Sequence, residues 1–226
     1  MNATTICLKL LQFSAILLLC LPLQSHASIN IVACFQTNDG RQELTPAEEE
    51  LIPLALQNAL PRGIFNAQDC ILVNTLSYEA TQTLNIGAAT GGAGAGKVTF
   101  DPFSIHKNVD ALSPFLFLQM SEGTAYKQIN FFFLSDVGNG AFQTRMIVQL
   151  GLAAIQSIQV SASTGGNLIN ELVQIEYGGI QTSVYLQTAT GGLTNSITSG
   201  WNRVKNVALP GGSFAPGILP TLPNIR

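Results

Sequence analysis

Histidine limits the catalytic chemistry that this chain could carry out. The 226 residues include two histidines, and the first, His26, lies in a segment that we expect to be removed. A Ser-His-Asp or Cys-His arrangement would therefore have to use His106. No Gly-x-Ser-x-Gly sequence accompanies it, and its place at the end of an expected strand favours a structural or exposed histidine. The residues argue for binding or assembly more than for catalysis.

A glycine-rich segment with a lysine, Gly91–Lys97, matches the first seven positions of the phosphate-binding pattern GxxxxGK. That pattern requires a Ser or Thr next, to hold magnesium, and a helix after it. Val98 stands at that position, and the residues that follow indicate a strand. We therefore expect a loop between strands and no nucleotide site.

Metal and paired-carboxylate chemistry have little support. A zinc site needs several ligands, and two distant cysteines with one histidine do not supply them. Nothing in the spacing of the acidic residues selects a catalytic pair. These residues are Asp101, Asp110, Glu122, Asp136, Glu171 and Glu176. We expect no cofactor and no metal, and a secreted hydrolase that uses His106 is the least favoured function.

The segment Met1–Ala27 has the parts of a cleavable secretory signal. Lys9 is its only charged residue and precedes the apolar run Leu10–Leu23. About 14 apolar residues are too few to span a bilayer comfortably. Small residues near Ala27 predict cleavage after it, whereas a lipoprotein signal at Cys20 or an uncleaved anchor is less favoured. We expect a secreted or periplasmic protein.

Removal of this segment leaves 199 residues (226 − 27) with 9 basic and 13 acidic side chains, a net charge of −4. This charge gives no reason to expect nucleic acid or an anionic membrane as partner. Few charges and many glycines indicate β structure. Cys34 and Cys70 remain of the four cysteines. In an exported chain they are expected to form one disulfide, with two separate buried thiols as the alternative.

The residue pattern indicates an antiparallel β domain with few helices. A capping box at Thr45 predicts a first helix that Pro53 interrupts. Ser113 as N-cap, Pro114 at the first position and Gly123 as the stop predict a second helix, apolar on nearly every side and therefore buried. The expected strands are residues 28–35, 71–78, 98–106, 126–135, 144–160, 171–177 and 180–188, with turns at Gly165-Gly166 and Gly178-Gly179.

The expected organisation has four parts. Residues 1–27 are the signal peptide, 28–69 an N-terminal strand with a helical appendage, and 70–206 the β domain. Residues 207–226 are rich in Pro and Gly and are expected to be a flexible tail.

The order of motifs between Ile71 and Asn206 resembles the haemolysin-coregulated protein (Hcp) family, the tube protein of type VI secretion systems. The matching pieces are GGAGAGKVTFDPFSI, NVDALSPFLFLQMSEGT, TRMIVQLGLAAIQSIQVS, ELVQIEY and a closing Gly-Trp-Asn with Lys-Asn. The family-motif residues are Ser113, Pro114, Gly123, Glu171, Gly200 and Trp201. Asn202 stands where the family has Asp. Residues 28–69 have an opening strand, as the family does, but a capped helix and two cysteines stand in place of the family's Gly-Glu-Ser turn.

The resemblance implies a small closed antiparallel β-barrel of two sheets with one short flanking helix. It implies homo-hexameric rings that stack into a tube with protein effectors in the lumen, and no catalytic residue or cofactor. The family's tube proteins need no secretory signal, so this chain resembles a divergent, signal-bearing member. The alternative is a periplasmic or surface Hcp-like binding module, a monomer or small oligomer outside any contractile tube.

Overall fold

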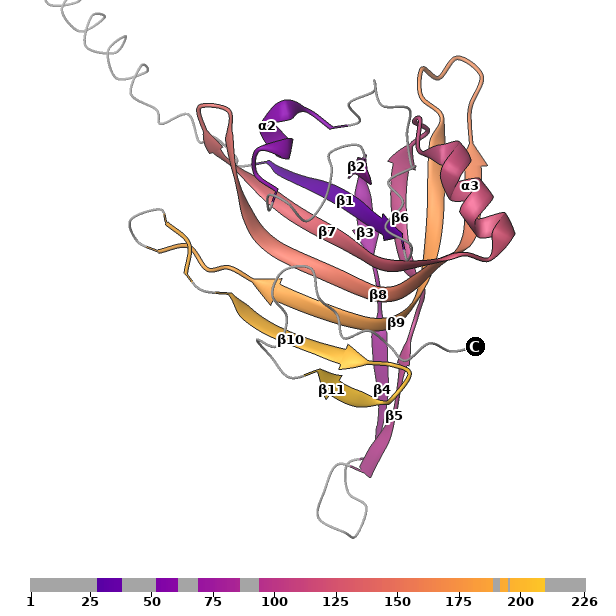
Figure 1. The fold of residues 1–226 in the computed structure, drawn as a ribbon, viewed down its shortest axis with the longest axis vertical. Helices are drawn as coiled ribbons and strands as arrows, with labels where there is room; N and C mark the ends of the chain where they lie inside the picture. Colours follow the sequence, from indigo (N-terminus) through magenta and orange to yellow (C-terminus); the bar gives the residue numbers. More distant parts are fainter. Residues whose placement is uncertain are drawn as a thin grey trace, which may run out of the picture.

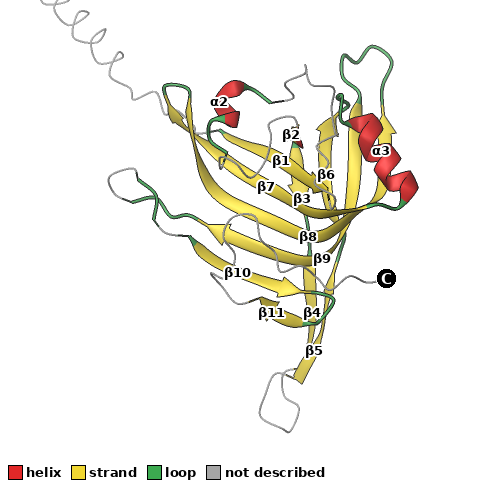
Figure 2. Cartoon of the chain, viewed as in Figure 1, coloured by secondary structure: helices red, strands yellow, loops and turns green. Residues whose placement is uncertain are grey.

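The computed structural model describes residues 28–37, 52–60, 69–85, 94–188, 192–194 and 196–209, and these are almost entirely antiparallel β structure (Figure 2). The expected signal peptide, residues 1–27, lies outside the described residues. None of the helices in the described ranges is long and apolar enough to cross a membrane.

Two sheets and two short helices make up the described chain. The strands are β1 Ile29–Thr37, β2 Cys70–Val73, β3 Thr75–Ser77, β4 Ala80–Asn85, β5 Gly94–Phe100, β6 Phe103–Asn108, β7 Ala125–Gly138, β8 Ala141–Ser161, β9 Asn170–Val184, β10 Ile197–Asn202 and β11 Val207–Leu209. The helices are α2 Leu54–Gln57 and α3 Ser113–Glu122.

The nine-stranded sheet closes on itself (Figure 1). Pairing runs from β1 through β7, β8, β9 and β6 to β3, while β2 returns to β1. Asn74 alone separates β2 from β3, and its N–H donates to the His106 carbonyl at 2.8 Å. The expected two-sheet barrel is thus one continuous sheet, and the second sheet is the hairpin β4–β5.

Strand β1 is part of this circuit, because it pairs with β2 on one edge and β7 on the other. The expected boundary at residue 70 therefore cuts through the barrel.

At the other end, residues 207–209 form β11 on the edge of β10, so the expected loose tail does not begin at residue 207. Residues 210–226 lie outside the described residues.

The turn predicted at Gly178-Gly179 is wrong, because both glycines lie within strand β9. The strand continues through both glycines, and one edge changes partner there. Its first half pairs with β6, as in Phe103 opposite Ile175. Its second half pairs with β10, with Asn202 opposite Gly179. The glycines mark this exchange of partners rather than a reversal of the chain.

Alternating residues of the strands face two different apolar clusters. Ala33 and Phe35 belong to the main core inside the barrel. Val32 and Cys34, which point the opposite way, belong to a second cluster that also contains Leu56 of α2. Helix α2 therefore covers part of the outer face of β1, β7 and β8.

The predicted N-terminal helical appendage is not shown, and the described residues of this segment contain only the four-residue helix α2. Within the described residues α2 begins directly after Pro53, consistent with proline's inability to donate inside a helix. Its predicted start at Thr45 lies outside the described residues.

Helix α3 is less buried than its composition predicts. Phe117 is 60% exposed and Leu118 is 48% exposed, while the helix buries Ser113 and Leu116. The expectation that α3 is covered on nearly every side is wrong for this chain, and the helix leaves apolar surface open.

Candidate functional site

A buried ionic cluster joins α3 to the barrel. Lys107 on β6 lies directly opposite Glu171 on β9, and its Nζ is 2.9 Å from Glu171 Oε2. The Lys107 side chain is fully buried and that of Glu171 is 2% exposed. Lys107 Nζ is also 2.9 Å from Asp110 Oδ1, so two carboxylates face one ammonium.

Ser113 completes this cluster and does not cap the helix as predicted. Leu112 holds the N-cap position, and no side chain caps the helix there. The Ser113 hydroxyl instead accepts a hydrogen bond from Lys107 Nζ at 2.8 Å and donates to Glu171 Oε2 at 2.8 Å. Asp110 Oδ1 accepts from the Leu112 N–H at 3.0 Å. The first turn of α3 is therefore tied to β6 and β9 by charge-assisted hydrogen bonds.

The two other motif residues of α3 shape its ends. Pro114 lies in the first turn, where a missing N–H costs nothing. Gly123 ends the helix with φ 66°, a left-handed conformation that glycine adopts without steric cost. The helix is thus fixed at its start by the ionic cluster and ended by a glycine.

Sequence reasoning missed Lys107. The sequence pattern could have identified it. Phe103, Ile105 and Lys107 are every second residue of β6 and so share one face of the strand, and the first two are core residues. A lysine on a core face requires a buried partner. Glu171 was identified only through the family resemblance, and its partner was not identified.

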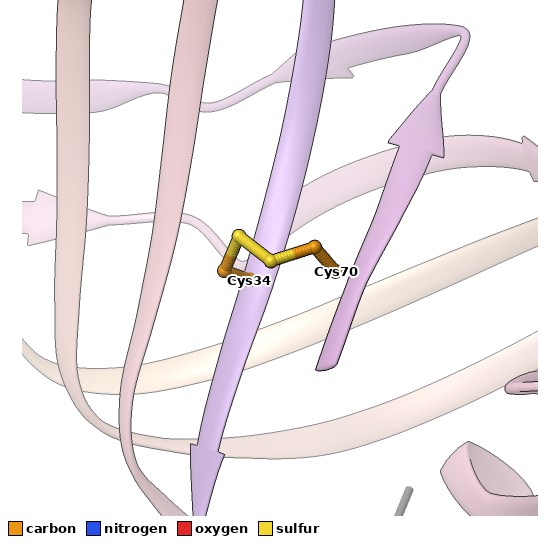
Figure 3. Close-up of a disulfide and its surroundings, with 2 residues drawn as sticks. All are labelled: Cys34 and Cys70. Atoms are coloured by element: carbon orange, nitrogen blue, oxygen red, sulfur yellow. A yellow bond between two sulfur atoms is a disulfide. The ribbon is translucent and has the colours of Figure 1, made fainter. Parts of the chain in front are cut away.

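The predicted pairing of the two cysteines is present. Cys34 on β1 and Cys70 on β2 form a disulfide between directly opposed residues, with Cα atoms 4.1 Å apart (Figure 3). Both cysteines are fully buried in the second apolar cluster. The bond therefore ties the two ends of the segment that carries α2 to the barrel wall.

The closing motif lies on β10, beside β9. Trp201 packs against the main core. Gly200 lies opposite Gln181, and a Cβ there would be 2.7 Å from the Ile180 carbonyl oxygen. Asn202, where the family has Asp, still supplies an acceptor, because its Oδ1 accepts from the Lys205 N–H at 2.9 Å. Glycine at position 200 is therefore required by the close approach of two strands.

Replacing Gly200 by Ala should lower the free energy of unfolding by about 1–3 kcal/mol, because the added methyl must displace strand backbone. Gly179→Ala is the matched control, since a Cβ there meets its nearest neighbour, the Trp201 carbonyl oxygen, at an ordinary 3.5 Å. That control should change stability by less than about 1 kcal/mol. Equal losses in chemical denaturation of the two variants would contradict the steric explanation.

An aromatic group lies at the base of the β4–β5 hairpin. Tyr78 stacks on Phe103 at 5.0 Å, and Phe103 meets Tyr177 edge-on at 6.3 Å. Burial raises the pKa of the Tyr177 hydroxyl, although the nearby Arg203 charge lowers it. Tyr177 therefore stays neutral at physiological pH.

The structure places the residues considered for catalysis and phosphate binding, His106 and Lys97, on strands. His106 is exposed on β6, and no cluster of three His, Cys, Asp or Glu in the described ranges could hold a metal ion. Lys97 and Val98 lie within strand β5, whereas a phosphate-binding loop requires a helix after its lysine. The arrangement is suited to holding a barrel and its projecting elements in place.

Comparison with known proteins agrees with this architecture. The family model described as type VI secretion system effector, Hcp, matches residues 65–184. A solved type six secretion system protein has a TM-score of 0.62 at 16% identity, covering 80% of this chain and 100% of that chain. Hcp1 from Salmonella typhimurium has a TM-score of 0.54 at 15% identity, with coverages of 80% and 99%.

Hcp1 from E. coli EAEC 042 has a TM-score of 0.54 at 14% identity, covering 78% of this chain and 99% of that chain. At these identities the likeness shows a shared fold. A comparison with curated proteins gives no match. Because the family model matches more than half of the residues, this chain belongs to the Hcp family of type VI secretion system proteins.

Proposed function

We propose that this protein is an exported, non-enzymatic structural subunit that assembles into homo-hexameric rings, as its family resemblance implies. Family membership supports this proposal, and the observation that carries it is the β4–β5 hairpin, which projects from the barrel (Figure 2). An isolated two-stranded hairpin is only marginally stable in water. In the described chain β4 and β5 pair only with each other. A neighbouring copy would supply the missing contacts.

The exposed side of α3 adds a second surface suited to contacts. Phe117 and Leu118 are largely open to solvent on a helix that the ionic cluster fixes to the barrel. A rigidly held apolar surface suits protein partners. Stacked rings and protein effectors are the partners that the family resemblance implies.

Export to the periplasm or the exterior is part of this proposal. The N-terminal segment has the features of a signal peptide, and the buried Cys34–Cys70 disulfide fits an oxidising compartment. N-terminal sequencing of the exported protein should begin at Ser28. A first residue of Met1 would contradict export by a cleaved signal.

A periplasmic or surface binding module is the second candidate. The feature that favours it is the segment between β1 and β2, where α2 and the disulfide cover the outer face of the barrel. Such a module would act as a monomer or small oligomer outside any contractile tube. The mass of the protein in solution separates the two functions.

Sedimentation velocity of residues 28–226 should give about six times the subunit mass, because the ring is the stable form of a Hcp-like tube subunit. A variant in which an Asn-Gly turn replaces residues 81–99 should keep the barrel, since Ala80 and Phe100 already face each other across the hairpin. We expect that variant to remain a monomer. A stable monomer of the unmodified chain at high concentration would contradict ring assembly and favour the binding module.

A further inference from the structure

Arg203 connects the turn after β10 to the root of the β4–β5 hairpin. Its guanidinium donates through Nη2 to the Phe100 carbonyl at 3.2 Å and through Nη1 to the Tyr177 carbonyl at 2.6 Å. Phe100 is the last residue of β5, and Tyr177 lies within β9. One side chain therefore joins the projecting hairpin to the barrel wall.

The same guanidinium lies near two aromatic rings. Its central carbon is 4.3 Å from the Tyr177 ring centroid and 5.3 Å from that of Phe100. A planar guanidinium can stack on a ring while its edge donates to carbonyl oxygens, whereas an ammonium cannot do both in this way. Arginine is therefore the residue type that this position requires.

The ion pair of Arg203 is a minor part of this contact. Arg203 Nη1 lies 2.9 Å from Glu176 Oε2, but the Glu176 side chain is 43% exposed. Solvent weakens such a pair strongly. The carbonyl bonds and the stacking, which involve less exposed groups, are the main restraint on the hairpin.

The hairpin root is held on two sides. The N–H of Asp101 donates to the Glu79 carbonyl at 3.0 Å, which keeps the two arms together where they leave the barrel. On the β3 side Tyr78 stacks on Phe103, which in turn packs against Phe131 in the core at 4.7 Å. On the β5 side, Arg203 in the β10–β11 turn restrains Phe100 through its carbonyl.

We infer that Arg203 is a positioning residue that fixes the direction of the β4–β5 hairpin, and thereby presents it to a second copy of this chain. The inference rests on the proposed ring assembly for its consequence. The restraint itself is a property of one subunit. Its two parts can therefore be tested separately.

Arg203→Lys keeps the positive charge but loses the planar group that binds two carbonyls and two rings. We expect amide hydrogen exchange in the peptides that cover β4 and β5 to become at least tenfold faster, with exchange in β7 and β8 unchanged. We also expect the hexamer fraction at a fixed concentration to fall severalfold, with the midpoint of thermal unfolding nearly unchanged. Phe100→Leu, which removes one ring, should change exchange in the same direction by less.

Arg145→Lys is the matched control, because that arginine donates to Gln187 Oε1 at the surface, away from the hairpin root. It should leave both exchange and assembly unchanged. Unchanged exchange in the hairpin of both Arg203→Lys and Phe100→Leu would overturn the inference. Faster exchange with an undiminished hexamer would overturn the assembly role, whereas a monomeric unmodified protein with faster exchange in Arg203→Lys would overturn only the proposed ring.

Discussion

Lys107→Met should lower the free energy of unfolding by about 3–5 kcal/mol, because it leaves the Glu171 carboxylate buried without its cation. Glu171 is 2% exposed, so water cannot replace the lost ammonium without opening the barrel. The change also removes a hydrogen bond to Ser113 at the start of α3. Urea denaturation followed by circular dichroism measures the loss.

Two further variants make this prediction specific. Lys127→Met removes an equivalent charge from the exposed side of β7 and should change stability by less than about 0.5 kcal/mol. Lys107→Met combined with Glu171→Leu removes the buried pair at similar volume and leaves Asp110, whose side chain is 24% exposed, in contact with water. It should recover most of the loss, since a buried pair is often replaceable by apolar residues. A double variant as unstable as Lys107→Met alone would show that the lost charge is not the cause.

Replacing both Cys34 and Cys70 by Ala should lower the free energy of unfolding by about 2–5 kcal/mol. The disulfide spans 36 positions of sequence, so its loss frees a long loop in the unfolded chain. Both cysteines are fully buried beside Leu56 of α2, so the change also leaves a gap in the second apolar cluster. Denaturation midpoints of the oxidised protein and the variant measure the difference.

Reductant provides the internal control for the disulfide. Dithiothreitol should destabilise the unmodified protein by most of the same amount and should have no effect on the double variant. If the unmodified protein is equally stable with and without reductant, the cross-link does not contribute as described. If the variant responds to reductant as well, the effect comes from another source.

Much of the barrel could be predicted from local sequence. Apolar runs rich in aromatic and β-branched residues placed most of β7 and β8, because both faces of these strands are buried over much of their length. The disulfide could be predicted because only two cysteines remain after the expected cleavage, and in an oxidising compartment two cysteines can form only one intramolecular pair. Gly123 was identifiable as the end of α3, since glycine readily adopts the left-handed conformation required there.

Other features depended on long-range pairing that local patterns do not contain. Gly178-Gly179 looks like a turn in sequence, but here it marks the place where one strand exchanges β6 for β10. Ser113 has the residue type of an N-cap. Its hydroxyl instead forms hydrogen bonds with Lys107 and Glu171, which lie on two different strands. The composition of α3 predicted burial, but its exposed face depends on how the helix docks onto the sheet.

These features describe a barrel whose attached elements are held firmly in place. The ionic cluster fixes α3, the disulfide fixes the segment around α2, and Arg203 ties the hairpin root to the barrel. Rigid presentation of contact surfaces reduces the entropy lost on association. The proposed ring assembly would use all three.

Electron microscopy of purified residues 28–226 tests ring assembly most directly. We expect six-fold symmetric rings with a central opening, and severalfold fewer of them for Arg203→Lys at the same concentration. Single barrels without six-fold symmetry, at concentrations where the protein is folded and its disulfide is intact, would contradict ring assembly.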